Sequence, residues 1–280
     1  MVMVLWLIVL LTVIAASFST HSRVETSMAG NLVEREKARL MAETGFNRAL
    51  LELMVVNSDQ RWQTNGQVYE MQDAAGQLRI AVRSAAGLVD LNKADRRDLV
   101  RLFALLSDDA EVREQLADSL EDWRDADDLR RLNGAEDSDY ASAGYAYGTA
   151  DRDLETVDEL GYVMGFDRPA VETLRPYVTV FSESGNVDLG AAPEQLVSLL
   201  TGDAALGGDV ADAFGQVESD LADINGINGI DGGDTVPGRR YRISVEAITA
   251  AGARSAIDVD IEMSNQPDAP YSILAWHDAF

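Results

Sequence analysis

Cysteine is absent from the 280-residue sequence, and histidine occurs only at His21 and His277. Without cysteine the chain can form no disulfide, thiol nucleophile or thiolate metal site. Two histidines are too few for a multi-histidine zinc or iron centre. The metal sites that remain possible are therefore those built from oxygen ligands.

Positive charge is also scarce, with 23 Lys and Arg against 48 Asp and Glu, which gives a net charge of −25. A chain this acidic repels a phosphate backbone, so general nucleic-acid binding is disfavoured. The apolar fraction of 46% is nevertheless ordinary for a folded protein. The length allows one large domain or two modest ones.

Catalytic motifs are weak. The glycine pairs at Gly207 and Gly232 are not followed by the Lys-Ser/Thr of a phosphate-binding loop. Neither histidine has a nucleophile at a recognisable spacing. Paired carboxylates could serve as the acid and base of a glycosidase, but no pattern marks one as buried and the other as exposed. We therefore expect no enzymatic activity, and a carbohydrate-active enzyme is the third-ranked alternative.

The N-terminus predicts a membrane segment. Residues 1–22 contain no Asp, Glu, Lys or Arg, and most of them are strongly apolar. As a helix, about 20 such residues span the ~30 Å hydrocarbon layer. A cleaved secretory signal is the main alternative, and Ala15-Ala16-Ser17 is a weak processing site, but the basic region of such a signal is missing. We predict a retained transmembrane helix over residues 1–22.

An amphipathic pattern follows over residues 23–56. Proline does not occur from Val24 to Val56, apolar residues recur at helical spacing from Leu32 to Leu53, and charges fill the other face. The two segments together predict one continuous rod of about 50 residues, ~75 Å long. A plain anchor with a stalk would have this pattern, and so would the long N-terminal helix of a pilin-like subunit.

The remaining chain predicts an α+β head. Strands are expected at both ends, with an α-helical domain inserted between them. The expected strands are Gln67–Gln72, Gln77–Arg83, Arg240–Ala247 and Ala253–Met263, with an edge strand at Tyr271–Trp276. The expected helices are Lys93–Trp123, Leu154–Gly165, Pro169–Pro176, Pro193–Leu200 and one near Val210–Leu221. We place the first part of the head at residues 57–92, the inserted domain at 93–184 and the second part at 185–280.

The most unusual segment runs from Asp118 to Asp139 and carries nine carboxylates against three arginines. Carboxylates this crowded raise one another's pKa unless a cation neutralises them. Oxygen ligands in a loop suit Ca²⁺, which takes 6–8 of them at about 2.3–2.6 Å, better than Mg²⁺. The spacing is not that of an EF-hand, and a solvated acidic loop is the alternative reading.

A helix-hairpin-helix interpretation competes for part of this region. Val89–Leu99 resembles the entry to such a unit, and Glu159–Ala170 resembles its hairpin. DNA-binding versions grip phosphates with glycine amides and nearby Lys or Arg, whereas the neighbours here are largely Asp and Glu. We expect the helix-hairpin-helix fold here without DNA binding. A membrane-anchored DNA-binding or DNA-uptake protein remains the second-ranked function.

Several features together resemble the protein K family, the large minor pseudopilins of the type II (general) secretion pathway. They are the charge-free N-terminal helix, Val-Asp-Leu-Asn-x-Ala from Val89, Asp-Trp-Arg-Asp-Ala-Asp-Asp over 122–128, Gly-Ala-Glu-Asp-Ser-Asp-Tyr over 134–140, and Asn-Val-Asp-Leu over 186–189. The similarity covers nearly the whole chain and is weakest from Gly202 to Gly238.

The resemblance implies a fold, a cofactor and partners. The fold is a pilin-like long N-terminal helix and antiparallel sheet with a large inserted α-helical domain that is SAM- or helix-hairpin-helix-like. The cofactor is one or two Ca²⁺ ions. The ligands that the resemblance implies are Asp125, Asp127, Glu136 and Asp137, with Asp122 and Asp139 as second choices. The partners are the minor pseudopilins I and J and the inner membrane, with no nucleic acid. The protein would cross that membrane once and hold its head in the periplasm at the pseudopilus tip.

Overall fold

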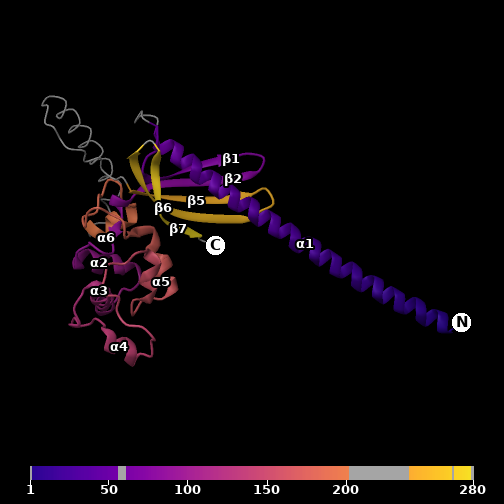
Figure 1. The fold of residues 1–280 in the computed structure, drawn as a ribbon, viewed down its shortest axis with the longest axis horizontal. Coiled ribbons are helices and arrows are strands. Elements are labelled where there is room, and N and C mark those ends of the chain that lie inside the picture. Colours follow the sequence, from indigo (N-terminus) through magenta and orange to yellow (C-terminus); the bar gives the residue numbers. More distant parts are fainter. Residues whose placement is uncertain (1, 56–60, 202–239, 267, 279–280) are drawn as a thin grey trace.

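A computed structural model of the chain describes residues 2–55, 61–201, 240–266 and 268–278. Helix α1 (Val2–Leu53) is continuous over 52 residues and confirms the predicted rod. Its first half projects away from the head, and its second half enters the head (Figure 1).

The predicted transmembrane helix falls in the projecting half of α1. Many side chains between residues 8 and 24 lie outside the described ones. Among the side chains that are described, no helix combines the length and the hydrophobicity that crossing a membrane requires.

The head contains a five-stranded sheet in the order β1-β2-β5-β6-β7, antiparallel throughout. The strands are β1 (Asn65–Gln72), β2 (Gly76–Ser84), β5 (Arg240–Thr249), β6 (Arg254–Gln266) and β7 (Ala269–Asp278). The sheet combines strands from both ends of the chain, as predicted, and strand β2 from before the insertion pairs with β5 from after it. The predicted edge strand is β7, and it is longer than expected.

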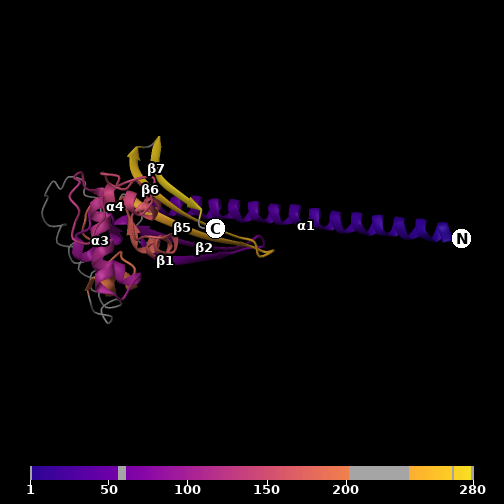
Figure 2. The ribbon, with the colours of Figure 1, turned by 90° about the horizontal axis from the view of Figure 1, so that it is seen from below.

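The C-terminal half of α1 packs along one face of the sheet (Figure 2). Alternate strand residues point toward the helix, as the period-2 pattern predicts. The core between them is built from Ala42, Phe46, Ala49, Leu50 and Leu53 of α1 and Ile80, Val82, Ile243, Val245, Ala247, Ile257, Val259 and Ile261 of the sheet. Glycine is required at one helix position, because a Cβ on Gly45 would lie 2.6 Å from Val245 Cγ1.

The insertion has its own hydrophobic core, separate from that of the sheet. It is closed by a short parallel pair, β3 (Val89–Asp90) with β4 (Val178–Thr179). Its other elements are η2 (Ala85–Gly87), α2 (Arg96–Leu102), η3 (Phe103–Leu105), α3 (Ala110–Arg124), α4 (Asp137–Ser142), η4 (Val157–Tyr162), α5 (Arg168–Leu174) and η5 (Arg175–Tyr177), and α6 (Glu194–Thr201) packs against this core. The structure does not fix the predicted domain bounds of 1–22, 23–56, 57–92, 93–184 and 185–280, which stay predictions.

Two helix predictions need correction. The helix predicted over Lys93–Trp123 is two helices, since Asp109 accepts a hydrogen bond from Glu111 N at 2.9 Å and starts a new helix. The helix predicted over Leu154–Gly165 is the 3₁₀ turn η4. The helix predicted near Val210–Leu221 lies outside the described residues.

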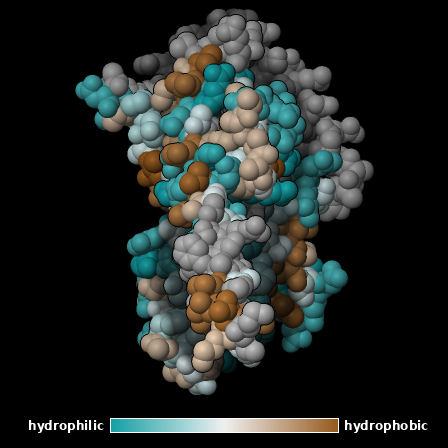
Figure 3. Space-filling model, turned by 90° about the vertical axis from the view of Figure 1, so that its right-hand side faces the viewer, coloured by the Kyte–Doolittle hydropathy of each residue, from teal (hydrophilic) through white to brown (hydrophobic). Residues whose placement is uncertain are grey.

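The described surface mixes apolar and hydrophilic residues when seen from the N-terminal side (Figure 3). Exposed apolar side chains are nevertheless frequent on α1 where it leaves the head, at Met28, Leu32, Val33 and Leu40. A row of apolar side chains that is exposed within the described part of the chain is typical of a helix that packs against another chain.

Candidate functional site

The acidic loop that follows helix α3 folds back over this helix. Two buried carboxylates of α3 hold the loop there. Asp118 and Asp122 lie one helical turn apart, and Asp122 is fully buried. Asp118 Oδ2 accepts a hydrogen bond from Asn133 N at 3.1 Å, and Asp122 Oδ2 accepts one from Arg131 N at 3.1 Å. These bonds satisfy backbone groups of the returning loop that burial removes from water.

The loop passes so close to α3 that glycine is required at position 134. A Cβ on Gly134 would lie 2.0 Å from Asp122 Oδ2. The Asn133-Gly134 pair is thus a point of close approach between the loop and the helix.

Arg131 supplies the positive charge on one side of the segment. Its guanidinium lies 2.9 Å from Glu121, 2.8 Å from Asp122 and in contact with Asp125 Oδ2. Burial by itself lowers the pKa of Arg131, but the hydrogen bonds to Asp125 and Asp122 outweigh it and raise the pKa above its ordinary value. Arg131 therefore stays charged.

Glu136 lies on the other side without such a partner. The residue immediately precedes α4 and is 5% exposed. Neither of its carboxylate oxygens has a hydrogen-bond partner in the part of the chain that the structure describes. Burial first, and then the negative charges of Asp122 and Asp125, raise the pKa of Glu136 to about 7. Asp125 Oδ1 is also buried and unpartnered among these residues. Within the described part of the chain, the segment thus holds three buried carboxylate oxygens that accept no hydrogen bond.

Asp151, which lies outside the six predicted ligands, also acts on Glu136 through its negative charge, as does Asp128. Asp151 has a φ of 52°, in the left-handed region that few residues other than glycine occupy. The Thr149 hydroxyl lies 2.9 Å from Asp151 Oδ1 and 3.1 Å from Asp137 Oδ1. The sequence signal that could have identified Asp151 is the second acidic run, which follows Tyr145–Gly148.

The six predicted ligands have different surroundings. The negative charges of Asp122 and Asp125 act on Glu136. Asp137 accepts a hydrogen bond from Thr149 N at 2.9 Å. Asp127 is exposed and accepts one from Leu129 N, whereas Asp139 pairs with Arg130 at 3.1 Å and accepts a bond from Glu136 N.

No group of three or more Asp, Glu or His side chains among the described residues is placed to hold a metal ion. The donor chemistry nevertheless fits one, because the three unpartnered oxygens of Asp125 and Glu136 are hard ligands of the type that Ca²⁺ takes. The calcium site stays a prediction.

The helix-hairpin-helix resemblance corresponds to η4 and α5, which lie next to each other in the insertion. Glu155, Asp158, Glu159 and Glu172 are in and around this hairpin. Their negative charges oppose contact with a phosphate backbone.

Residues 78–183 match the family model described as type II secretion system (T2SS), protein K. The chain is similar to type II secretion system protein K from Klebsiella pneumoniae, with 26% identity over 65% of this chain and 62% of the relative. It is also similar to protein K from Pseudomonas aeruginosa, with 30% identity over 51% of this chain and 46% of the relative. The alignments thus span less than two thirds of the length of these relatives.

The fold is similar to a solved chain in the crystal structure of the GspK-GspI-GspJ complex from the enterotoxigenic Escherichia coli type 2 secretion system. The TM-score is 0.51 with 16% identity, and the match covers 93% of this chain and 99% of that chain. This similarity confirms the predicted fold class, a mixed helix and antiparallel-sheet architecture with a long N-terminal helix.

Proposed function

We propose that this chain, whose residues 78–183 match the family model of type II secretion protein K, is the minor pseudopilin at the tip of the pseudopilus, which it initiates and caps for protein export. The observation that carries the proposal is the helical insertion between β2 and β5 of a sheet packed on a long N-terminal helix. The matched residues cover this insertion from β2 to just beyond β4.

The shape supports a capping role. The insertion lies at the end of the head that is distant from the N-terminus of α1 (Figure 1). In a filament whose shaft is made of such helices, a bulky head would block the addition of another subunit above it. The role is one of assembly and needs no catalytic group.

The chain would be held in the inner membrane before assembly. Residues 1–22 carry no charged side chain, and a charge within the hydrocarbon layer is costly. The first part of α1 would then cross the membrane once and leave the head in the periplasm.

Minor pseudopilins I and J are the proposed partners. The similar solved chain belongs to a complex with GspI and GspJ. On the present chain, the exposed apolar side chains of α1 provide a surface for two further pilin-like helices.

A calcium ion would rigidify the acidic segment of this head. Asp125 and Glu136 would hold it through their unpartnered oxygens, with Asp128 and Asp151 near enough to add negative charge. When bound, the ion supplies positive charge where carboxylates otherwise repel one another. The chain's own residues, Asp118 and Asp122, hold the loop against α3.

Co-purification tests the proposal. The full chain would be co-expressed with the I and J pseudopilins of the same genome, and we expect all three to elute together. Leu40→Asp on α1 should reduce this co-elution, whereas Leu132→Asp, at a 90% exposed position in the acidic loop, should leave it unchanged. Elution of the chain alone, while I and J bind each other, would contradict the proposed partnership.

A further inference from the structure

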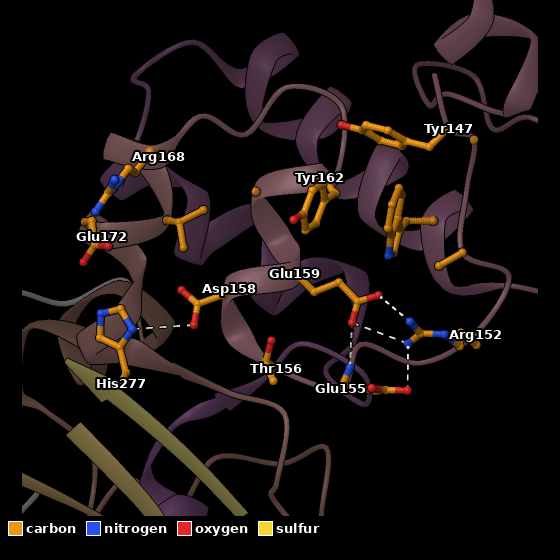
Figure 4. A pocket seen from close by; sticks show the side chains of 15 residues that line it. Tyr147, Arg152, Glu155, Thr156, Asp158, Glu159, Tyr162, Arg168, Glu172 and His277 are labelled. Carbon is orange, nitrogen blue, oxygen red and sulfur yellow. Dashed lines mark hydrogen bonds and ion pairs between the residues drawn. The ribbon is translucent and has the colours of Figure 1, made fainter. Parts of the chain in front are cut away.

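A pocket of about 820 Å³ lies between the insertion and the last strand of the sheet. Helix α3, the loop after α4, η4 and α5 line it, and His277 of β7 closes one side (Figure 4). Its size falls within the roughly 300–1,000 Å³ of small-molecule sites, which form preferentially where two structural units meet. The roles proposed above do not use this pocket.

Aromatic rings line part of the pocket at right angles to one another. Tyr147 and Tyr162 have ring centroids 5.7 Å apart with an interplanar angle of 88°, and Trp123 and Tyr147 are 6.3 Å apart at 85°. Tyr162 is 58% exposed, and Tyr147 is exposed as well. Exposed ring faces at a concave surface are favourable contact area for the apolar face of a ligand.

The aromatic wall also contains a hydrogen-bond donor without an acceptor. Trp123 is buried, and its Nε1 has no partner among the residues that the structure describes. A buried indole N–H ordinarily finds an acceptor. Because the N–H is covered from solvent, the Trp123 ring would have to turn toward the pocket for a ligand oxygen to accept its hydrogen bond.

The charges around the pocket are largely paired with one another. Glu159 lies 3.0 Å from Arg152, and Asp158 lies 2.5 Å from Arg175 and 3.6 Å from His277. Figure 4 shows Arg168, Glu172 and His277 on the side opposite Tyr147. A strongly charged ligand of either sign would be repelled by side chains of its own sign here. The lining therefore favours a neutral ligand.

We propose that this pocket binds a neutral saccharide of one or two pyranose rings. The C–H face of a sugar ring packs on an exposed tyrosine, as in other aromatic ligand contacts. Sugar hydroxyls both donate and accept hydrogen bonds, so they match a lining with carboxylates, guanidinium groups and an unpaired indole N–H. Arg168, exposed and without an ion-pair partner in the described part of the chain, is available to donate to them.

The test uses the full chain in a detergent without a sugar head group, such as a zwitterionic amine oxide. Saturation-transfer NMR would be recorded with cellobiose, chitobiose and maltose at millimolar concentration. We expect transfer to ring protons of at least one disaccharide. Tyr162→Ala should weaken that binding about tenfold, the loss of one ring contact.

Tyr69→Ala on β1 is the control, because Tyr69 is a partly exposed tyrosine outside the pocket lining whose ring stacks on Trp62 and on no lining residue. It should retain transfer, and near-ultraviolet circular dichroism should show that both variants are folded. No transfer from any of the three disaccharides would overturn the proposal, as would equal binding by the Tyr162→Ala variant. Tyr162-dependent binding of an uncharged Ala-Ser peptide instead of the sugars would show a peptide site and also overturn it.

Discussion

Asp122 shows how one carboxylate of a crowded acidic segment acquires a structural task. It is fully buried, and it accepts hydrogen bonds from the backbone and the guanidinium of Arg131. Removal of the carboxylate would leave the Arg131 backbone N–H unpaired beside α3, whereas the guanidinium would keep Glu121 and Asp125. The cost of leaving buried donors unpaired is about 1–3 kcal/mol.

The first prediction follows from that cost. Asp122→Ala should lower the free energy of unfolding of the head by about 1–3 kcal/mol, as measured by urea denaturation of the full chain in detergent. Asp127→Ala should change it by less than about 0.5 kcal/mol, because Asp127 is exposed and bonds only to the nearby Leu129 N–H. Equal losses in the two variants would show that burial does not set the role of Asp122.

The second prediction concerns Glu136 and calcium. Calcium at 100 times its dissociation constant should stabilise the head by about 2.7 kcal/mol, which raises its melting temperature by several degrees over that in EDTA. Glu136→Gln keeps the shape but removes the charge, so its melting temperature in EDTA should be at or above that of the unchanged chain. Its rise with calcium should be smaller or absent.

Calorimetry with CaCl₂ and with EDTA checks this prediction for both proteins. Asp73→Asn is a suitable control, because Asp73 lies in the β1–β2 turn outside the acidic segment, where its side-chain oxygen accepts a hydrogen bond from Ala75 N. It should retain most of the calcium response. Superimposable melting curves of the unchanged chain with and without calcium would contradict the site.

Composition alone locates the acidic segment but cannot assign roles within it. The clustering from Asp118 to Asp139 predicts repulsion, but burial is the first cause of the raised pKa of Glu136, and the charges of Asp122 and Asp125 add to it. The sequence gives no sign that the loop returns over α3. That return buries Asp122, pairs it with Arg131 and brings Asp151 near Glu136, so the differences among ligand candidates arise from tertiary packing.

At the scale of elements, α1 offers a comparison within one helix. Gly45 faces the sheet, where an added Cβ would lie 2.6 Å from Val245 Cγ1, whereas a Cβ on Gly30 would have no neighbour within 4 Å. Valine is stiff at χ1, so Val245 cannot easily move aside. Close packing of α1 against β5 thus depends on the missing side chain at position 45.

The third prediction uses this pair. Gly45→Ala should destabilise the head by about 1–3 kcal/mol through overpacking, partly offset by the better helix propensity of alanine. Gly30→Ala should leave the unfolding midpoint of the head unchanged or slightly higher. Near-ultraviolet circular dichroism during urea unfolding measures both, and a stabilised Gly45→Ala variant would show that the sheet can yield at this contact.

Strands were predicted more accurately than helix ends. Alternating residues such as Ile243 and Val245 require one buried face, and that requirement alone fixes the strand and its orientation. The points at which one helix of the insertion ends and the next begins depend instead on which residues cap a helix N-terminus. Asp95 and Asp109 each begin a helix, and the apolar pattern from Leu99 to Leu120 continues across the break between them.

At the scale of the whole molecule, two separate cores must be joined. Arg242 of β5 is buried and forms paired hydrogen bonds of 2.9 and 3.0 Å with Asp260 of β6. The same guanidinium donates to the carbonyl oxygens of Arg175 at 2.7 Å and Val178 at 3.0 Å, at the end of the insertion. This residue therefore links the sheet to the insertion through a single buried group.

The fourth prediction is that Arg242→Lys uncouples the two cores. Lysine keeps the charge, but its one ammonium lacks the planar fork that reaches a carboxylate and two carbonyls together. The loss of hydrogen bonds to a charged group should cost about 1.5–3 kcal/mol. In calorimetry of the full chain we expect the insertion to melt before the sheet.

Arg79→Lys is the control, at a half-exposed ion pair on the sheet. It should cost less than about 1 kcal/mol and keep one transition, because exposed pairs contribute little. A single unshifted transition in Arg242→Lys would mean that the remaining contacts between insertion and sheet suffice to couple them.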